Sequence, residues 1–336
     1  MKTASKPSIP FWSFVTVILG ILCLPTTAEV QDTLKKSFSV GAGGTLIVDV
    51  DRGSIDITTG SGNELRVEVI RKANSLSRAR AESILKEHKV ELKQEGNNVR
   101  IYSRYRIGRS WSIWGWRRAG LSVRYAISTP RQYNADLATA GGSISTSDLD
   151  GQVKARTSGG SLKFGRMLGP IWGRTSGGSI TVQACKHSVD VESSGGGLKI
   201  GEVEGSVVGR TSGGSIEISR VTGNVMARTS GGSIRVNEVL GKIDASTSGG
   251  SVNARLSSQP EGDCTLKTSG GSIEVQLPER IAVNLDASTS GGRVITDFPV
   301  TVQGELRKNA LKSKLNGGGP ALVLHTSGGN VHIRRL

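Results

Sequence analysis

The chain has 336 residues, enough for one large domain or two ordinary ones. Its 46 glycines and its hydrophobic content of only 36% disfavour a helix-rich globule. The formal net charge is +15, and residues 66–131 alone hold 16 lysines and arginines against five glutamates. Such a strongly basic segment favours an anionic partner.

Residues 1–28 have the pattern of an export signal. Lys2 and Lys6 precede an uncharged, mostly apolar run at Phe11–Leu24, and small residues follow up to Ala28. A retained anchor is the alternative reading, although the run is short for a bilayer span. We expect cleavage near Ala28 and export to the periplasm, the outer surface or the medium.

Residues 29–135 are predicted to form an N-terminal capping segment that contains both strands and a helix. Residues 45–58 alternate apolar and polar positions and bend at Gly53, which predicts a first unit of two strands. Residues 75–88 are rich in alanine, leucine, arginine and glutamate, which predicts one short helix. Further strands are predicted at 65–70, 90–94, 99–105 and 121–129.

A loop rich in tryptophan and arginine, 106–120, interrupts this segment. Tryptophan stacks on sugar rings or lies at a lipid interface, and arginine pairs bidentately with phosphate or carboxylate. Alternatively, the loop is a cap whose aromatic side chains cover the open end of a stack of strands. The candidate binding residues in and beside it are Arg104, Arg106, Arg109, Trp111, Trp114, Trp116, Arg117 and Arg118.

The rest of the chain, 136–336, is a repeat built on the phrase Thr-Ser-Gly-Gly-Ser. Apolar residues alternate on both sides of each Gly-Gly pair, so each unit is predicted to hold two short strands with glycine corners. Glycine suits a corner that needs a positive φ or a close backbone approach. The pairs recur at one constant spacing as far as Gly249, and the first glycines of all the pairs are Gly141, Gly159, Gly177, Gly195, Gly213, Gly231, Gly249, Gly270, Gly291 and Gly328.

The constant unit length predicts an all-β fold, a parallel β-solenoid with rungs of about 18 residues stacked in chain order. An antiparallel meander is the alternative, because Gly-Gly also makes a two-residue hairpin turn. The longer units are expected to bulge at 257–263 and 277–280. One degenerate unit is predicted between Gly291 and Gly328, with its corner near 316–320.

Alternation places the residue before each threonine on the outside of the stack and the threonine itself inside. The outward residues form a mostly cationic stripe, which is either a solvated face that discourages sideways aggregation or a binding stripe for an anionic polymer. Its basic members are Arg156, Arg174, Arg210, Arg228 and Lys267.

Enzymatic motifs are not found: the sequence has no Gly-x-Ser-x-Gly and no phosphate-binding loop, and its carboxylates recur at no fixed position of the unit. Cys185 and Cys264 lie about four rungs apart, too far for a disulfide, and are predicted to be small core or corner residues. Cys185 with His187 gives only two ligands in one place, so no metal and no cofactor is expected.

The sequence resembles the bacterial putative-adhesin family of β-strand-repeat proteins. The resemblance rests on the export signal, the opening GTLIVDVDRGSIDI at 44–57, the strand ending at Pro130 and the TSGG-type units. It covers nearly all of the chain after the signal. It implies a repeat architecture and an adhesin-like role, and the family offers no catalytic residues to carry over.

These features predict a non-catalytic, exported scaffold of the cell envelope that contacts anionic polysaccharide, lipopolysaccharide or membrane through the tryptophan and arginine loop. A second hypothesis is a rod that self-associates into a filament or coat, because the chain finishes on a strand at 330–336 that could leave an uncapped end. A third is a carbohydrate-active enzyme with a hidden carboxylate pair. Nucleic acid is disfavoured as the partner of an exported protein.

Overall fold

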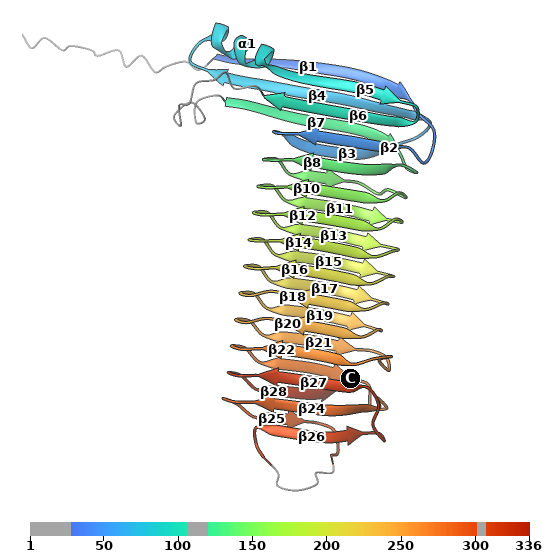
Figure 1. Ribbon diagram of the computed structural model, residues 1–336, viewed down its shortest axis with the longest axis vertical. Helices are drawn as coiled ribbons and strands as arrows, with labels where there is room; N and C mark the ends of the chain where they lie inside the picture. The colour runs from blue at the N-terminus through green and yellow to red at the C-terminus, as the bar shows by residue number, and fades with distance from the viewer. Residues whose placement is uncertain (1–27, 106–119, 301–306) are drawn as a thin grey trace, which may run out of the picture.

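The computed structural model describes residues 28–105, 120–300 and 307–336, which form a long rod of 28 strands and one helix (Figure 1). The strands make two sheets of 14 strands each, called sheet A and sheet B here. Apolar side chains from both sheets are buried along the whole rod. The all-β solenoid predicted from the repeat is therefore the fold of this chain, and the meander is wrong.

The N-terminal end of the rod combines a first rung, antiparallel strands and the helix. In sheet A, β7 pairs in parallel with β3, β4 pairs antiparallel with β7, and β1 pairs antiparallel with β4. In sheet B, β5 pairs antiparallel with β6. The helix α1 begins after its N-cap Ser77 and buries Ala81, Ile84 and Leu85. The elements are β1 Ala28–Ser39, β2 Thr45–Val50, β3 Ser54–Gly60, β4 Glu64–Ser75, α1 Arg78–Glu87, β5 His88–Glu95, β6 Asn98–Tyr105 and β7 Gly120–Pro130.

From β8 to β23 each rung gives one strand to sheet B and then one to sheet A, and like strands pair in parallel. The sheet B strands are β8 Asn134–Thr139, β10 Val153–Thr157, β12 Ile171–Thr175, β14 Val189–Ser193, β16 Val207–Thr211, β18 Val225–Arg228, β20 Ile243–Ser246 and β22 Cys264–Thr268. The sheet A strands are β9 Ile144–Thr146, β11 Leu162–Met167, β13 Ile180–Cys185, β15 Leu198–Val203, β17 Ile216–Val221, β19 Ile234–Val239, β21 Val252–Leu256 and β23 Ile273–Leu277. The extra residues of the longer units lie between strands, as predicted.

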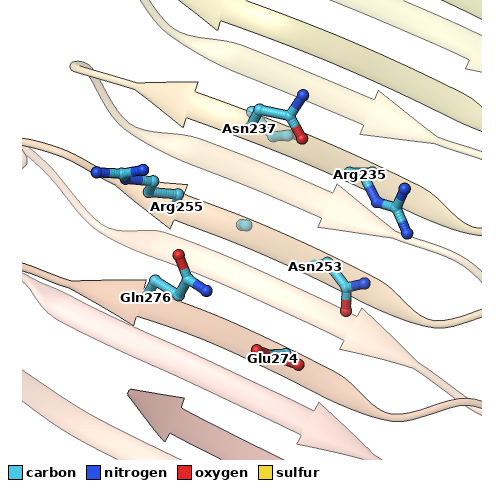
Figure 2. Close-up of a pocket in the computed structure, with 8 residues that line it drawn as sticks. Arg235, Asn237, Asn253, Arg255, Glu274 and Gln276 are labelled. Carbon is cyan, nitrogen blue, oxygen red and sulfur yellow. The ribbon is translucent and has the colours of Figure 1, made fainter. Parts of the chain in front are cut away.

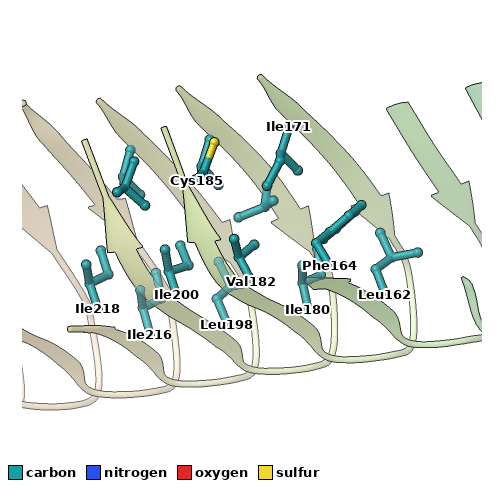
Figure 3. Packing of buried hydrophobic residues seen from close by; sticks show 14 of the residues in the cluster. Leu162, Phe164, Ile171, Ile180, Val182, Cys185, Leu198, Ile200, Ile216 and Ile218 are labelled. Carbon is teal, nitrogen blue, oxygen red and sulfur yellow. The ribbon is translucent and has the colours of Figure 1, made fainter. Parts of the chain in front are cut away.

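The core between the sheets is thin and is filled by columns of aliphatic side chains, one from each rung (Figure 3). At some rungs a large residue of sheet A packs against a glycine of sheet B. A Cβ on Gly173 of β12 would lie 3.2 Å from the ring of Phe164 and 3.3 Å from Leu162. Close packing of this kind makes each rung seal the apolar surface of the next, so the short strands need no thicker core.

The Gly-Gly corners need glycine because of close approach and not because of a positive φ. None of the paired glycines of the repeats has a positive φ, whereas Gly53 in the first unit does, at +114°. A Cβ on Gly160, the second glycine of its pair, would lie 2.1 Å from the carbonyl oxygen of Gly142. A Cβ on the first glycine, Gly159, would lie 3.7 Å from its nearest neighbour, an ordinary contact. At this corner the glycine that has no room for a Cβ is therefore the second of the pair. At later corners the first glycine is also tightly placed: a Cβ on Gly270 would lie 2.9 Å from the carbonyl oxygen of Gly249.

The threonine before each corner is buried, as predicted, and its hydroxyl links two rungs. Thr157 donates to the carbonyl oxygen of Gly142 in the preceding rung at 2.7 Å, and the N–H of Gly160 donates to the Thr157 hydroxyl at 3.3 Å. The same pair of bonds recurs up the rod, with serine replacing threonine at Ser193. Hydroxyl and glycine therefore act together, which explains why the whole phrase repeats.

At the C-terminal end the strands leave chain order. Strand β27 lies between β22 and β24, and β28 lies between β23 and β25. Thr326 accordingly donates to Gly271, while Thr289, which precedes it in the chain, donates to Gly329. The strands are β24 Val283–Thr289, β25 Val294–Thr296, β26 Ala310–Leu315, β27 Ala321–Thr326 and β28 Val331–Arg335.

One prediction for this end is therefore wrong. The degenerate unit expected between Gly291 and Gly328 is a single strand, β26, antiparallel to β24, and its turn uses positive φ values at Asn316, Gly317 and Gly318 to reverse the chain. The strand at 330–336, β28, is not the last of its sheet, because it pairs with β23 on one side and β25 on the other. The outermost described strands at this end are β25 and β26, and self-association stays a prediction.

Candidate binding surfaces of the rod

The predicted tryptophan and arginine loop lies outside the described residues, as does the export signal up to residue 27. Arg106, Arg109, Trp111, Trp114, Trp116, Arg117 and Arg118 are among them. The strands that flank the loop are described. It leaves β6 after Tyr105 in sheet B and re-enters β7 at Gly120 in sheet A. Strand β6 pairs with β2, and β7 pairs with β3. The corner at Gly53 joins β2 to β3, so β6 ends and β7 begins at the edge of the rod that carries the Gly-Gly corners.

Arg104 is the one predicted loop residue that the structure describes, and it is held firmly. Its guanidinium donates to the carboxylate of Asp49 at 2.8 Å and to the carbonyl oxygen of Asp49 at 3.1 Å, and it stacks 4.3 Å from the ring centre of Tyr102. The hydrogen bond to Asp49 raises the pKa of Arg104. Its charge is therefore fixed in place and partly neutralised.

The predicted basic stripe is a true column on the outer face of sheet B. Arg156 pairs in register with Arg174, Arg210 with Arg228, and Lys267 with His325. Glu192 occupies the position between Arg174 and Arg210 and interrupts the positive charge. The geometry of the column is as predicted, and its role in binding stays a prediction.

Most of the stripe has carboxylate partners one rung away. Arg174 lies 2.9 Å from Asp190 and 3.3 Å from Glu192, and Arg228 lies 3.0 Å from Asp244. Arg210 lies 3.8 Å from Asp190. Arg156 and Lys267 make no ion pair with any described residue. The sequence predicted the positions of the arginines but not their pairing with Asp190 and Asp244, which lie in the neighbouring column of outward side chains.

Trp172 is a functional candidate that sequence reading missed. It lies on the outer face of β12, half buried, with the guanidinium of Arg174 4.7 Å and that of Arg156 6.0 Å from its ring centre. A tryptophan at an outward position of a strand was the available signal. Cation–π contacts at exposed sites contribute about 0.5–1 kcal/mol each, so the ring helps to fix the positions of both guanidinium groups.

An open hollow of about 630 Å³ joins Arg104 to this part of the stripe. It is lined by the Thr-Ser corners of successive rungs and by charged side chains of both signs, which are Arg104, Arg156, Arg174, Asp49, Asp51 and Glu192. The loop at 106–119 leaves β6 next to Arg104. The hollow therefore begins where the loop begins and runs along the rod toward Arg174.

The remaining reactive side chains lie in the core. Cys185 and Cys264 are buried free thiols in different rungs, and burial raises the pKa of both. Within 28–105, 120–300 and 307–336, no group of three or more His, Cys, Asp or Glu side chains is placed to hold a metal ion. In the same ranges, no helix has the length and apolar character to cross a membrane.

These observations define a parallel β-solenoid with polar columns on both outer faces. The model of the Toastrack DUF4097 family matches residues 44–334, so the chain belongs to that family, and the predicted resemblance to repeat proteins of the adhesin type is confirmed. No curated protein matches the chain.

Several solved structures are similar to it at low identity. They include a putative cell adhesion protein from Clostridium sporogenes, at 11% identity over 91% of this chain and 100% of that one, with a TM-score of 0.23. A putative adhesin from Parabacteroides distasonis has 12% identity over 91% and 97%, with a TM-score of 0.36. A putative lipid binding protein from the same organism has 12% identity over 91% and 97%, with a TM-score of 0.32.

Proposed function

We propose that the protein is a non-catalytic, exported, adhesin-like scaffold of the cell envelope. In this role the rod is a spacer, and the tryptophan and arginine loop attaches its N-terminal end to an anionic envelope polymer, lipopolysaccharide or an anionic membrane. Membership of a repeat family and the straight columns of outward side chains support binding to an extended partner. A catalytic role would need acid and base groups that converge on one substrate atom.

The observation that carries the proposal is the hollow beside the loop. Arg104, Arg156 and Arg174 line it together with the polar Thr-Ser corners, and Trp172 contacts two of these arginines. Three acids, Asp49, Asp51 and Glu192, line it as well, so Arg156 is the arginine of the hollow that makes no ion pair with a described residue. A polymer or headgroup held by the loop could therefore continue along the corner edge of the rod. Guanidinium groups recognise carboxylate and phosphate in the same bidentate way, so both classes of anion fit.

Co-sedimentation tests the role of the loop. The protein is mixed with vesicles containing phosphatidylglycerol, with vesicles of phosphatidylcholine alone, and with an insoluble anionic polysaccharide. We expect binding to an anionic target that falls at least tenfold in a W111A/W114A/W116A variant and weakens as salt is raised from about 0.05 to 0.5 M. Equal binding by wild type and variant removes the loop from the mechanism, and binding that persists in high salt removes the charge.

A further inference from the structure

The outer face of sheet A carries a second set of polar columns, separate from the stripe on sheet B. The second residue of each strand, from β11 to β23, points outward, and like residues pair in register up the rod. These residues are Lys163, Thr181, Lys199, Glu217, Arg235, Asn253 and Glu274. The fourth residue of each strand forms a parallel column of Gly165, Gln183, Gly201, Ser219, Asn237, Arg255 and Gln276.

The cations and amides of this face have no partners within the described chain. Lys163, Lys199, Arg235 and Arg255 make no ion pair or side-chain hydrogen bond with another described residue, and nor do the side-chain amides of Gln183, Asn237, Asn253 and Gln276. On sheet B, by contrast, three of the five stripe cations are paired with carboxylates. A ligand on sheet A therefore gains bonds without first breaking any within the protein.

Two open hollows lie on this face. One, of about 370 Å³, is surrounded by six polar side chains from β19, β21 and β23, and Figure 2 shows them spread over three successive strands. These are Arg235, Asn237, Asn253, Arg255, Glu274 and Gln276. The other, of about 630 Å³, lies between Lys163 and Lys199, where Gly165 and Gly201 lack side chains and lower the surface. Both hollows lie along the same two columns.

The balance of charge favours an acidic ligand. The carboxylate of Glu274 is engaged by Arg334 at 3.3 Å. Glu217 pairs in register with Lys199 on one side and Arg235 on the other, and it makes no ion pair in the described chain. Glu217 is the one carboxylate that these two columns carry between the hollows, and it should weaken the binding of an acidic polymer. Two further acids lie beside the columns: Asp148 lines the second hollow, and Glu202 follows its lining residue Gly201.

We propose that the outer face of sheet A binds an acidic polysaccharide of the uronic-acid class, lying along the rod. Guanidinium groups pair bidentately with carboxylates, and primary amides both donate to and accept from sugar hydroxyls. The columns repeat at the strand spacing of about 4.8 Å, so one polymer chain contacts several rungs, and each added contact is intramolecular. A membrane would instead need exposed apolar side chains, and single-stranded nucleic acid would need aromatic platforms, neither of which these columns carry.

This inference goes beyond the role proposed for the loop, because its residues lie on the other sheet and it stands whether or not the loop binds. The test uses protein from cells expressing the full-length chain, with polygalacturonate as the probe and neutral dextran of similar length as the comparison. Affinity is measured by biolayer interferometry at about 0.05 M salt, where screening is weak. Three variants give the readout: R235Q/R255Q, E217Q and the matched control K154Q/K314Q. The control changes two sheet B cations, on β10 and β26, that lie outside the basic stripe and the hollow beside Arg104.

We expect polygalacturonate to bind and dextran not to bind. R235Q/R255Q should weaken binding at least tenfold, while K154Q/K314Q, which removes the same charge from sheet B, should weaken it less than threefold. E217Q should tighten binding several-fold. Because all these side chains are on outer faces, the variants should keep the wild-type circular dichroism and unfolding temperature.

Three results would overturn the inference. The first is no binding of polygalacturonate to the wild type. The second is an equal loss in the two double variants, which would show that net charge alone acts. The third is loss of binding in W111A/W114A/W116A with no loss in R235Q/R255Q, which would leave the role of the loop standing and remove that of sheet A.

Discussion

In the middle of the rod, from β8 to β23, every strand pairs with the equivalent strand of the neighbouring unit, whereas at both ends strands pair antiparallel or out of chain order. The same three features stabilise every rung of the middle: a buried hydroxyl that bonds to the preceding rung, a glycine without room for a Cβ, and apolar side chains stacked in columns. The ends use individual contacts instead. Arg71, for example, lies nearly buried in the N-terminal end and binds Asp32 at 2.5 Å.

The difference shows which part of a solenoid resists edge-to-edge association. Unpaired strand edges are templates for another chain, and natural proteins protect them with charges or irregular strands. The last strand of sheet B, β26, carries Lys312 and Lys314 and runs antiparallel to its neighbour. At the other end, β1 and β5 are the outermost strands. Sheet A ends at the three-residue strand β25, so the outermost described strands are short, charged or antiparallel to their neighbours.

The largest effect is expected from removing the inserted rung. Deleting residues 321–336 removes β27 and β28 from between two other rungs and loses the buried Leu322, Leu324, Val331 and Ile333. Burial of such side chains contributes roughly 1.5–3 kcal/mol each, so the C-terminal end should unfold. Hydrogen exchange should show loss of protection in 264–300.

The matched control is an internal deletion of 282–319. Strands β22 and β23 pair directly with β27 and β28, so this deletion leaves a stack in plain chain order. We expect the shortened rod to fold and to keep protection in 264–277. If the internal deletion loses as much protection as the terminal one, then the inserted rung is not what holds this end together.

A second effect distinguishes the two glycines of a corner. Gly160→Ala places a Cβ 2.1 Å from a backbone oxygen, whereas Gly159→Ala places it 3.7 Å away. We expect Gly160→Ala to lower the free energy of unfolding by about 3 kcal/mol or more, because backbone in the regular stack cannot shift without breaking register. Gly159→Ala should cost less than about 1 kcal/mol. Equal losses in urea titrations would contradict the close-approach explanation.

The contrast between the middle and the ends also explains what the sequence could predict. The repeat predicted rung length, strand positions, inward threonines and the outward column through Arg156 and Arg174, because all follow from alternation within a unit of constant length. The rung order at the C-terminus could not be predicted, because the TSGG unit at Thr326 fits equally well beyond β24, in chain order, or between β22 and β24, where it lies. Its position depends on tertiary pairing.

The candidate surfaces were predictable only in part. Register places residue i beside residue i+18, and the acids that bind Arg174 and Arg228 lie at i+16, at Asp190 and Asp244. This spacing rule was available from the sequence once the fold was assumed. Applied to Arg235 it finds Ser251, which is not an acid. Applied to Arg255, whose rung is longer and whose register partner is Gln276, it points to Glu274, which pairs with Arg334 instead. The free state of Arg235 was therefore predictable, and that of Arg255 was not.

A third effect should appear at the N-terminal end as a dependence on pH. His88 is buried, its Nε2 lies 2.8 Å from the hydroxyl of Ser103, and burial, with the nearby Arg71, lowers the pKa of His88 to about 4. An unfolded histidine has a pKa of about 6.5, so the unfolded chain binds the proton first as pH falls. The stability that the neutral ring contributes is present above pH 6.5 and is lost between about 6.5 and 4.

The variant H88Q keeps a polar side chain but cannot titrate in this range. We expect the unfolding temperature of the wild type to fall more than that of H88Q between pH 7 and pH 5, because carboxylates titrate alike in both proteins and cancel in the comparison. Hydrogen exchange should place the difference in β5 and β6. A parallel fall in the two proteins would show that His88 is already charged in the folded state.

The smallest effect concerns the hydroxyl in the regular stack. Thr211→Val keeps the shape of the side chain but removes its bond to the Gly196 carbonyl oxygen, 2.7 Å away, and leaves that oxygen without its hydroxyl donor. We expect a loss of about 1–2 kcal/mol in the free energy of unfolding by urea. Thr211→Ser should lose less, because Ser193 makes the same bonds in the preceding rung. If valine and serine cost the same, the column is held by shape and not by its hydrogen bonds.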